Sequence, residues 1–293
     1  MSENTKLKFT GERFLPDCQR EIWYEHYHRY HMVAQWVEGK VVLDAACGEG
    51  YGSHILSHNA GRVLGVDVSA EAVEHAKSEY SNENLRFMHS DILALDLPEN
   101  SVDVVVSFET IEHLAEHEDL LRVFKRVLKD DGMLIISTPD KAEYSDKTGF
   151  ENEYHVKELY KDEFAGLIQK EFKYTEWLGQ KLMFQSAIWR MDQNLKTLTM
   201  QTHQDDGQAL LNKMPFNPLY FIVVASNKNI DSSNIDDCYG FTDKSESVYE
   251  HYNEMIREYI SVAEKFVKLN DQQQKWRKHP IIGRCIRWFD KEK

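Results

Sequence analysis

The sequence predicts an α/β fold in which helices cover both faces of a seven-stranded, mostly parallel sheet. Short apolar runs rich in β-branched residues alternate with segments of helical periodicity, and the runs are continuously apolar. Continuously apolar strands are typical of parallel sheets that are buried on both faces. The seven predicted strands are residues 41–45, 62–66, 85–89, 102–108, 132–138, 172–179 and 218–227.

The segments between these strands have helical spacing. Ser69 is suited to cap a helix over 70–80, because a serine side chain accepts a hydrogen bond from a free N–H group at a helix start. A further helix is predicted over 157–170. The helix between the fourth and fifth strands has an apolar stripe formed by Leu120, Leu121, Phe124 and Leu128.

The domain organisation changes after the last predicted strand. Residues 1–227 are predicted to form one domain, in which the polar segment 187–215 is an insertion or a lid. Residues 228–245 are rich in Asp, Ser and Asn, which is typical of a linker. Residues 246–274 then have apolar side chains at spacings of three and four, which predicts a coiled-coil helix that joins copies of the chain in a homo-oligomer. A helix that packs the same stripe on its own domain is the alternative. The predicted seam consists of Tyr249, Tyr252, Ile256, Tyr259, Ala263, Phe266 and Asn270.

Residues 275–293 predict a basic amphipathic tail. This segment has seven Lys or Arg residues against two Asp or Glu, whereas the whole chain has a formal net charge of −14 at pH 7. Trp and Phe interleaved with Lys and Arg suit the surface of an anionic membrane, and docking of the tail on the acidic body is the alternative. The first interpretation makes the protein a peripheral protein on the inner face of the cytoplasmic membrane.

The composition excludes several classes of protein. A chain of 293 residues with 42% hydrophobic residues is enough for one large domain, or a medium domain with an appendage. The acidic charge disfavours nucleic acid, DNA included, as a partner. Four scattered cysteines disfavour zinc clusters and a disulfide framework. The N-terminus lacks the apolar core of a signal peptide, and no apolar run approaches the ~20 residues of a membrane span. We therefore expect a cytosolic protein.

The stretch "VVLDAACGEGYG" joins a strand to a helix through a glycine-rich turn. Gly48, Gly50 and Gly52 remove side chains where the backbone bends sharply and approaches a ligand. Asp67 ends the second strand, where a carboxylate can accept hydrogen bonds from ribose hydroxyls, and Asp91 follows the third strand, near an adenine amino group. The turn alone is shared with dinucleotide-binding Rossmann folds, and a helix cap is the alternative role of Asp67.

Taken together, these motifs resemble the class I S-adenosylmethionine (SAM)-dependent methyltransferases over roughly residues 25–226. The resemblance implies a Rossmann-like fold, SAM as cofactor and methyl transfer as the activity. This chain departs from the family at Ala46, where the first glycine is common, and a small residue there is a mild change. The implied cofactor contacts are Arg29 at the carboxylate, Ala46, Gly48 and Gly50 at the methionine portion, Asp67 at the ribose, Asp91 and Ile92 at the adenine, and Phe108 beneath the sulfonium.

The stretch "SFETIEHL" follows the buried fourth strand and carries Glu109, Glu112 and His113 at spacings of three and four. If the chain turns helical directly after the strand, the three side chains share one face. Ligands bind at the carboxyl ends of strands in open α/β sheets, so these residues are predicted to be catalytic, as a hard-cation site or as an acid/base group. Capping and solvation of a helix start is the alternative for Glu112 and His113.

A second histidine, His155, follows the fifth strand and is expected at the same edge of the sheet. The pattern Glu-x-x-Glu-His, followed by Thr-Pro and a later His, resembles the small-RNA 2′-O-methyltransferases. Its first part also resembles the O-methyltransferases of the ubiquinone pathway. The resemblance implies that Glu109, Glu112, His113 and His155 hold a divalent metal such as Mg²⁺ or Mn²⁺. A cation bound to two adjacent hydroxyls lowers the pKa of one of them, which suits a sugar or a catechol.

Three acceptors compete on these observations. An RNA hydroxyl fits the metal cluster but not the acidic body, and a small phenol or quinone precursor leaves the C-terminal segments unexplained. "TGERFLP" and "EHYHRY" near the N-terminus, with "HPIIGRCIRW" near the C-terminus, resemble methyltransferases of bacterial surface polysaccharides such as O-antigens. This resemblance implies a lipid-linked glycan acceptor and, as a hypothesis, methylation of a terminal sugar that stops chain growth. A non-catalytic scaffold and an NAD-linked dehydrogenase fit the motifs less well.

We predict that Asp67→Ala abolishes SAM binding, whereas His113→Ala spares binding and removes turnover. The first substitution removes the carboxylate assigned to the ribose hydroxyls, and the second removes a group assigned to proton or metal chemistry. Titration calorimetry and a methyl-transfer assay measure the two effects separately. Normal SAM binding by both variants would contradict the cofactor assignment.

Overall fold

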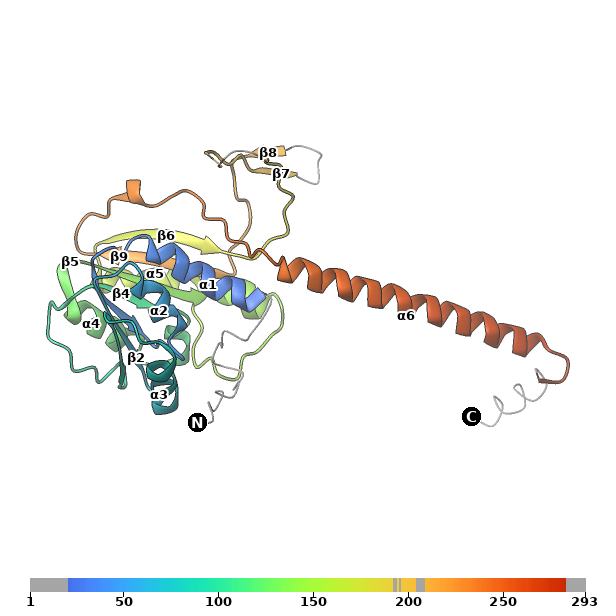
Figure 1. Cartoon of the computed structure of the whole chain (residues 1–293), viewed down its shortest axis with the longest axis horizontal. Coiled ribbons are helices and arrows are strands. Elements are labelled where there is room, and N and C mark those ends of the chain that lie inside the picture. The colour runs from blue at the N-terminus through green and yellow to red at the C-terminus, as the bar shows by residue number, and fades with distance from the viewer. Residues whose placement is uncertain (1–20, 192–193, 195, 204–208, 283–293) are drawn as a thin grey trace. The chain divides into compact units, whose positions relative to one another are not determined.

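The computed structural model describes residues 21–191, 194, 196–203 and 209–282. The chain divides into two compact units between Phe241 and Thr242, and each unit is treated by itself. The first unit contains the sheet, and the second contains one long helix (Figure 1).

The first unit is built on a seven-stranded sheet with the order β3-β2-β1-β4-β5-β9-β6. Neighbours among β1 to β5 pair in parallel, and β9 runs antiparallel to both β5 and β6. The predicted seven-stranded, mostly parallel sheet is therefore confirmed. The strands are β1 (Val41–Ala45), β2 (Arg62–Asp67), β3 (Leu85–His89), β4 (Val102–Ser107), β5 (Leu128–Pro139), β6 (Tyr174–Gln180) and β9 (Tyr220–Ser226).

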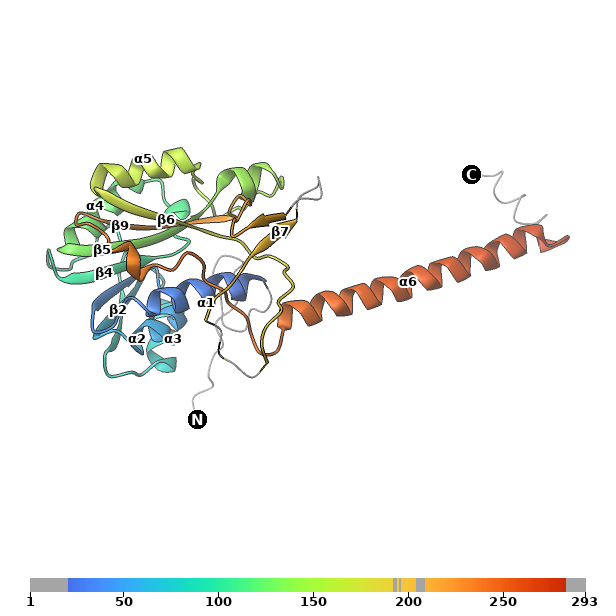
Figure 2. The same ribbon diagram turned by 90° about the horizontal axis from the view of Figure 1, so that it is seen from above.

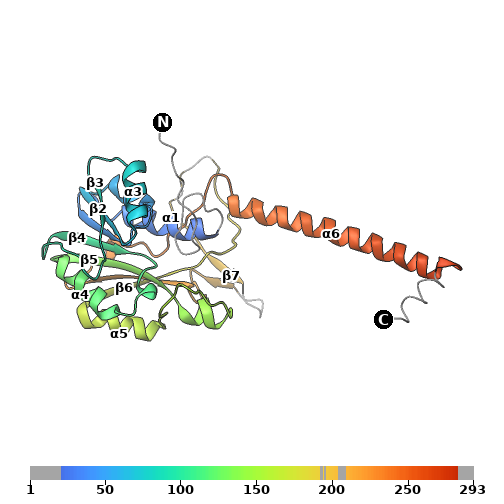
Figure 3. The ribbon, with the colours of Figure 1, turned by 90° about the horizontal axis from the view of Figure 1, so that it is seen from below.

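Helices cover both faces of this sheet, as Figures 2 and 3 show. One face carries α1 (Glu21–Ala34), α2 (Tyr51–Ser57) and α3 (Ala70–Glu79), and the other carries α4 (His117–Val127) and α5 (Lys161–Glu171). Successive side chains of a strand point to opposite faces. Val104 and Val106 accordingly pack in the core under the first set of helices, and Val105 packs under the second.

Two local predictions are corrected by the structure. The apolar stripe of α4 does not include Leu128, because the helix ends at Val127 and Leu128 begins β5 in an extended conformation. Part of the predicted linker is packed, since Phe241 contacts the rings of Trp23 and His28 on α1 at 5.4 and 5.3 Å. Aromatic contacts of this kind stabilise a segment that composition alone marks as irregular.

The polar segment between β6 and β9 contains a separate two-stranded antiparallel sheet. It consists of β7 (Gln201–His203) and β8 (Ala209–Leu211). Its role as a lid stays a prediction.

The second unit contains α6 (Ser247–Lys278), an uninterrupted helix of 32 residues. This helix covers the segment predicted as a coiled coil, and the coiled coil itself stays a prediction. Within the described part of the chain, no helix is both long and apolar enough to cross a membrane. Residues 283–293 of the predicted membrane tail, and the "TGERFLP" motif, lie outside the described residues.

We predict that Gly52→Ala destabilises the first unit. A Cβ atom at Gly52 would lie 2.1 Å from Cζ of Tyr30, whose ring is buried and whose hydroxyl donates to Asp44. Overpacking of this kind costs about 1–3 kcal/mol. Thermal unfolding should therefore occur at a lower temperature. The matched control is Gly166→Ala in α5, where a Cβ meets nothing within 4 Å and alanine favours the helix. Equal melting temperatures for the two variants would contradict the prediction.

Candidate active site

A cavity of about 1030 Å³ lies at the carboxyl ends of β1, β2, β3 and β4. One part, which we call the turn half, is bordered by the glycine turn and by residues at the ends of β2, β3 and β4. The other part, which we call the Glu–His half, follows β4 and β5. The turn half is lined by Ala46, Cys47, Gly48, Asp67, Asp91, Ile92 and Phe108. The Glu–His half is lined by Glu109, Glu112, His113, Tyr144, Phe150, Asn152, His155 and Tyr220, among others. Parallel strands bring their carboxyl ends to one edge, so residues distant in sequence share this cavity.

The glycine turn depends on left-handed backbone conformations. Ala46, Gly48 and Gly50 have φ angles of 61°, 56° and 95°. Glycine adopts this region readily, whereas an L-residue does so at a cost of roughly 1–2 kcal/mol. Ala46 is thus a strained residue where the family often has glycine. Gly50 does not line the cavity, and a Cβ there would lie 2.8 Å from Ala76 and from the ring of Phe87.

Asp67 joins the glycine turn to the end of β2. Its Oδ2 accepts a hydrogen bond from the Gly48 N–H at 2.8 Å, and its Oδ1 accepts one from the Ser69 N–H at 2.8 Å. Ser69 in turn caps α3, because its hydroxyl accepts from the Ala72 N–H. A carboxylate oxygen has a further lone pair, so Asp67 can also accept from a ligand hydroxyl. The cap contact and the position in the cavity therefore coexist.

Asp91, Ile92 and Phe108 line the turn half, and their contacts with a cofactor stay predictions. Asp91 also accepts a hydrogen bond from the Leu93 N–H at 2.9 Å, which closes the turn after β3. The structure adds Asp44, whose carboxylate accepts hydrogen bonds from Tyr30 and Ser53 at 3.0 and 2.6 Å. Burial raises the pKa of Asp44 to about 6. This buried acid anchors α1 and α2 beneath the turn.

Arg29 does not line the cavity. Its side chain is 1% exposed, and its Nη1 donates to Oε1 of Glu109 at 2.7 Å and to the Ser137 hydroxyl at 3.4 Å. Its Nε and Nη2 are buried without a hydrogen-bond partner among the described residues. The assignment of Arg29 to the cofactor carboxylate stays a prediction, and the contact that the structure does contain is the ion pair with Glu109.

The backbone conformation of Glu109 keeps its side chain apart from Glu112, the other acidic residue of "SFETIEHL". The residue adopts a φ of 48°, so the chain does not turn helical directly after β4, and only the short 3₁₀ helix Ile111–His113 follows. Because the left-handed residue redirects the chain, Glu109 points to Arg29 and does not join Glu112 and His113. Strained residues of this kind concentrate at functional sites.

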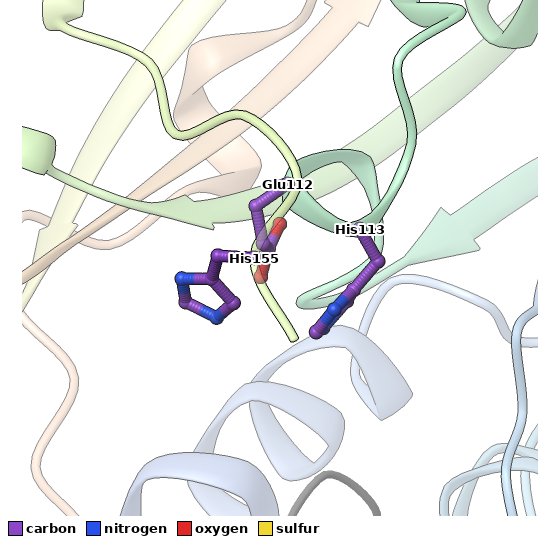
Figure 4. A group of neighbouring side chains, drawn as sticks. All are labelled: Glu112, His113 and His155. Carbon is purple, nitrogen blue, oxygen red and sulfur yellow. The ribbon is translucent and has the colours of Figure 1, made fainter. Parts of the chain in front are cut away.

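Glu112, His113 and His155 come together, with one ligand atom from each within 4.8 Å of the others (Figure 4). Glu112 is fully buried, its Oε2 accepts from the Thr138 hydroxyl at 3.1 Å, and its Oε1 has no hydrogen-bond partner among the described residues. Burial raises the pKa of Glu112 well above its usual range, and the neighbouring Glu109 adds to the effect. Three of the four predicted metal ligands thus bring their ligand atoms together, and Glu109, which pairs with Arg29, is not part of this group.

The two histidines are oriented by hydrogen bonds. His113 Nδ1 lies 2.9 Å from the Tyr154 carbonyl oxygen. A carbonyl only accepts, so Nδ1 carries the proton and the lone pair is on Nε2. His155 Nδ1 likewise lies 2.6 Å from Oε1 of Glu158, and its Nε2 lies 3.0 Å from the Asn152 amide nitrogen. In both histidines the ring is held by a group outside the cluster, as is usual for metal-ligating imidazoles.

Aromatic side chains that the sequence analysis missed complete the Glu–His half. Tyr144, from the one-turn π-helix Ala142–Asp146, stacks on His155 with ring centroids 5.5 Å apart and meets the edge of Phe150 at 5.8 Å. Phe150 is 54% exposed at the cavity. Single-turn π-helices are often found at functional sites, but their sequences have no distinctive period.

A buried acid, Glu25, also lies next to Tyr220 of the Glu–His half. Tyr220 donates to Oε2 of Glu25 at 3.0 Å, and the Tyr220 ring lies 4.8 Å from the Arg29 guanidinium. Burial raises the pKa of Glu25 to about 7, against an opposing effect of Arg29. The sequence contains no local signal for this network, because its members come from α1 and β9, far apart in the chain.

Comparison with known proteins identifies relatives of this chain. Residues 43–136 match the family model described as a methyltransferase domain. A probable SAM-dependent methyltransferase of Mycobacterium tuberculosis is 37% identical over 165 residues, which is 55% of this chain and 60% of that protein. One from Mycolicibacterium smegmatis is 34% identical over 177 residues, which is 59% of this chain and 68% of that protein. The chain thus spans about three fifths of the M. tuberculosis relative.

Two further comparisons concern a more distant relative and the fold. The mitochondrial ubiquinone biosynthesis O-methyltransferase of Schizosaccharomyces pombe is 33% identical over 105 residues, 34% of this chain and 38% of that protein. The crystal structure of a SAM-dependent methyltransferase from Archaeoglobus fulgidus is similar with a TM-score of 0.51 at 17% identity, covering 71% of this chain and 94% of that one. This structural similarity concerns the fold alone.

We predict that Glu25→Gln stabilises the protein more at pH 8 than at pH 5. The folded-state pKa of about 7 lies above the ordinary value of 4.5, so the protonated acid favours folding at low pH and this contribution is lost as the pH rises through 7. Glutamine is neutral at both pH values and can still accept from Tyr220. The gain in unfolding free energy caused by Glu25→Gln should be about 2 kcal/mol larger at pH 8 than at pH 5. Chemical denaturation measures it, with the exposed Glu83→Gln as control. An equal effect of Glu25→Gln at both pH values would contradict the prediction.

Proposed function

The chain belongs to the SAM-dependent methyltransferases, and we propose that it methylates a sugar hydroxyl of a bacterial cell-surface glycan of the O-antigen type. The observation that carries this proposal is the location of Glu112, His113 and His155 in the same cavity as the glycine turn. A hydroxyl beside this cluster would face a methyl donor bound in the turn half. Such alignment is the main requirement of methyl transfer, because SAM already carries a good leaving group.

The proposed reaction needs a base at the acceptor. The hydroxyl oxygen forms a bond to the methyl carbon while the carbon–sulfur bond breaks, the sulfonium sulfur keeps the electron pair, and the hydroxyl proton leaves. Without a bound metal, His113 is the proposed proton acceptor, since its Nδ1–H is held by the Tyr154 carbonyl and its Nε2 carries the lone pair. With a cation in the site, this lone pair would bind the cation, and the hydroxyl proton would leave to solvent.

The same residues fit a divalent cation. Glu112 contributes a buried Oε1 without a hydrogen-bond partner in the described chain, and each histidine has an oriented ring. His155 would have to exchange its Asn152 contact for the metal. Two imidazoles and one carboxylate suit Mn²⁺ better than Mg²⁺, which prefers oxygen ligands. When bound, the cation would coordinate adjacent hydroxyls and lower the pKa of the one to be methylated.

The side chains of the Glu–His half support a sugar as the acceptor. Tyr144 and Phe150 offer aromatic faces on which the C–H face of a sugar ring can pack, and Glu151 and Glu153 offer carboxylates to its hydroxyls. A flat phenol has few groups to use these carboxylates. Methylation of a phenolic ubiquinone precursor is nevertheless the second candidate, because the S. pombe relative carries that name. The net charge of −14 disfavours an RNA hydroxyl.

The acceptor in this proposal is lipid-linked and is reached at the cytoplasmic face of the membrane. The support is the mixture of aromatic and basic residues over 275–293, which suits an anionic surface. Methylation of a terminal sugar would remove the hydroxyl that the next sugar needs, so the reaction would stop chain growth. The resident metal, the membrane contact and the chain-stopping role are parts of one proposal, which the following experiment separates.

The experiment follows label from isotope-labelled SAM into lipid-linked glycan, RNA and small-lipid fractions of a membrane extract from the source cells. We expect label in the glycan, loss of incorporation with chelator, and recovery with Mn²⁺ more than with Mg²⁺. His113→Ala should lower turnover by about 10²–10⁴-fold without loss of SAM binding. The control is His58→Ala, an exposed histidine that does not line the cavity.

Each other outcome changes a stated part of the proposal. Glycan labelling that resists chelator would remove the metal and keep His113 as the base. Label only in the small-lipid fraction would replace the sugar by the phenol. Label only in RNA would contradict the proposal.

A further inference from the structure

The long helix α6 (Figure 1) has two rows of apolar residues along its length, most of them exposed. Met255, Val262 and Leu269 are spaced by seven and are 52%, 56% and 62% exposed. Tyr259 and Phe266, also spaced by seven, are 75% and 69% exposed, and Tyr252 continues their row. Rows that alternate at spacings of three and four are the a and d positions of a coiled coil. These residues place the centre of the apolar face slightly to one side of the seam predicted from the sequence.

We propose that α6 pairs with α6 of a second copy of the chain in antiparallel orientation. If Tyr259 of one helix is aligned with Val262 of the other, the row of Tyr252, Tyr259 and Phe266 on each helix packs against the row of Met255, Val262 and Leu269 on its partner. Tyr252 then lies against the partner's Leu269, Met255 against the partner's Phe266, and Tyr259 against the partner's Val262. Each aromatic ring therefore faces an aliphatic side chain. The two-fold axis repeats every contact, so the pair closes without leaving a free copy of the surface.

Charge complementarity favours this orientation. Glu258 and Lys265 lie on one flank of the rows, seven residues apart, which is too far for an ion pair within one helix. In the antiparallel alignment Glu258 lies between the layers of Met255 and Tyr259. The partner's Lys265 lies at the same level, between the layers of the partner's Phe266 and Val262. Glu258 therefore lies beside the partner's Lys265, and the two-fold axis gives two such charge pairs in each dimer. In a parallel pair in register, Glu258 would face the partner's Ala263 and Lys265 would face the partner's Asn270.

The opposite flank is apolar and also self-complementary. In the antiparallel alignment Ile256, which is 55% exposed, lies beside the partner's Ala263, and Tyr249 lies beside the partner's Asn270. Large side chains thus meet small or polar ones. The remaining side of the helix carries charged residues such as Arg257 and Glu264, together with the exposed Ile260 and Val267. An isolated helix with this much exposed apolar surface gains most of its stability from packing, and the second copy supplies that surface.

The test is sedimentation equilibrium of the full chain near neutral pH and ~0.1 M salt, where exposed charge pairs are only partly screened. Wild type is expected to dimerise. Glu258→Lys and Lys265→Glu each turn two attractive pairs into two repulsive ones, and each should weaken dimerisation about tenfold. The double variant with both substitutions should regain the wild-type Kd.

The matched control is Arg257→Glu, which makes the same charge change as Lys265→Glu on the side of α6 that faces away from the rows. It should leave the Kd unchanged, and circular dichroism should show equal helix content in all variants. A monomeric wild type, a trimer, single variants without effect or a double variant that stays weak would each overturn the antiparallel pair. Methyl transfer is not part of this readout, so the result is independent of the proposed function.

Discussion

Parallel pairing of β1 with β2 on one side and β4 on the other is the constraint on which the rest of the structure depends. The pairing makes the three strands end at one edge, so the turn after β1, the carboxylate of Asp67 and the segment after β4 become neighbours. The Asp67 hydrogen bond to the Gly48 N–H then fixes the turn against the end of β2. Without this arrangement, the glycine turn would not lie beside Asp67 and the segment after β4, and the cavity would not form.

Buried polar groups in the first unit are concentrated around this edge. Three buried polar features lie behind or within the cavity: the ion pair between Arg29 and Glu109, the Glu25 contact with Tyr220, and Oε1 of Glu112, which has no hydrogen-bond partner in the part of the chain that the structure describes. A buried charge is costly unless it is paired, and a buried acid without a partner is more costly still. Such groups add little stability to the fold, and their clustering is typical of a site at which proton or metal chemistry occurs.

Glu112 also organises the segment that carries His155. Its backbone carbonyl accepts hydrogen bonds from the N–H groups of Val156 and Lys157 at 2.8 and 3.0 Å. The turn after β4 and the loop after β5 are therefore joined through the same residue that contributes a carboxylate to the cluster. A substitution at Glu112 would alter the carboxylate, whereas the backbone contact that orients His155 is available to any residue at this position.

The sequence by itself determined the seven strands of the large sheet, the glycine turn, Asp67 at the end of β2 and the placement of Glu112, His113 and His155 at one edge, because each depends on local periodicity or on the end of a strand. It did not predict the small sheet of β7 and β8. Only the tertiary structure decided that Glu109 pairs with Arg29, since a left-handed residue redirects the chain. It also decided the contact of Tyr220 with Glu25, 195 residues apart, and the packing of Tyr144 on His155. Long-range contacts arise when strands and helices pack, and no local pattern in the chain specifies which side chains will then meet.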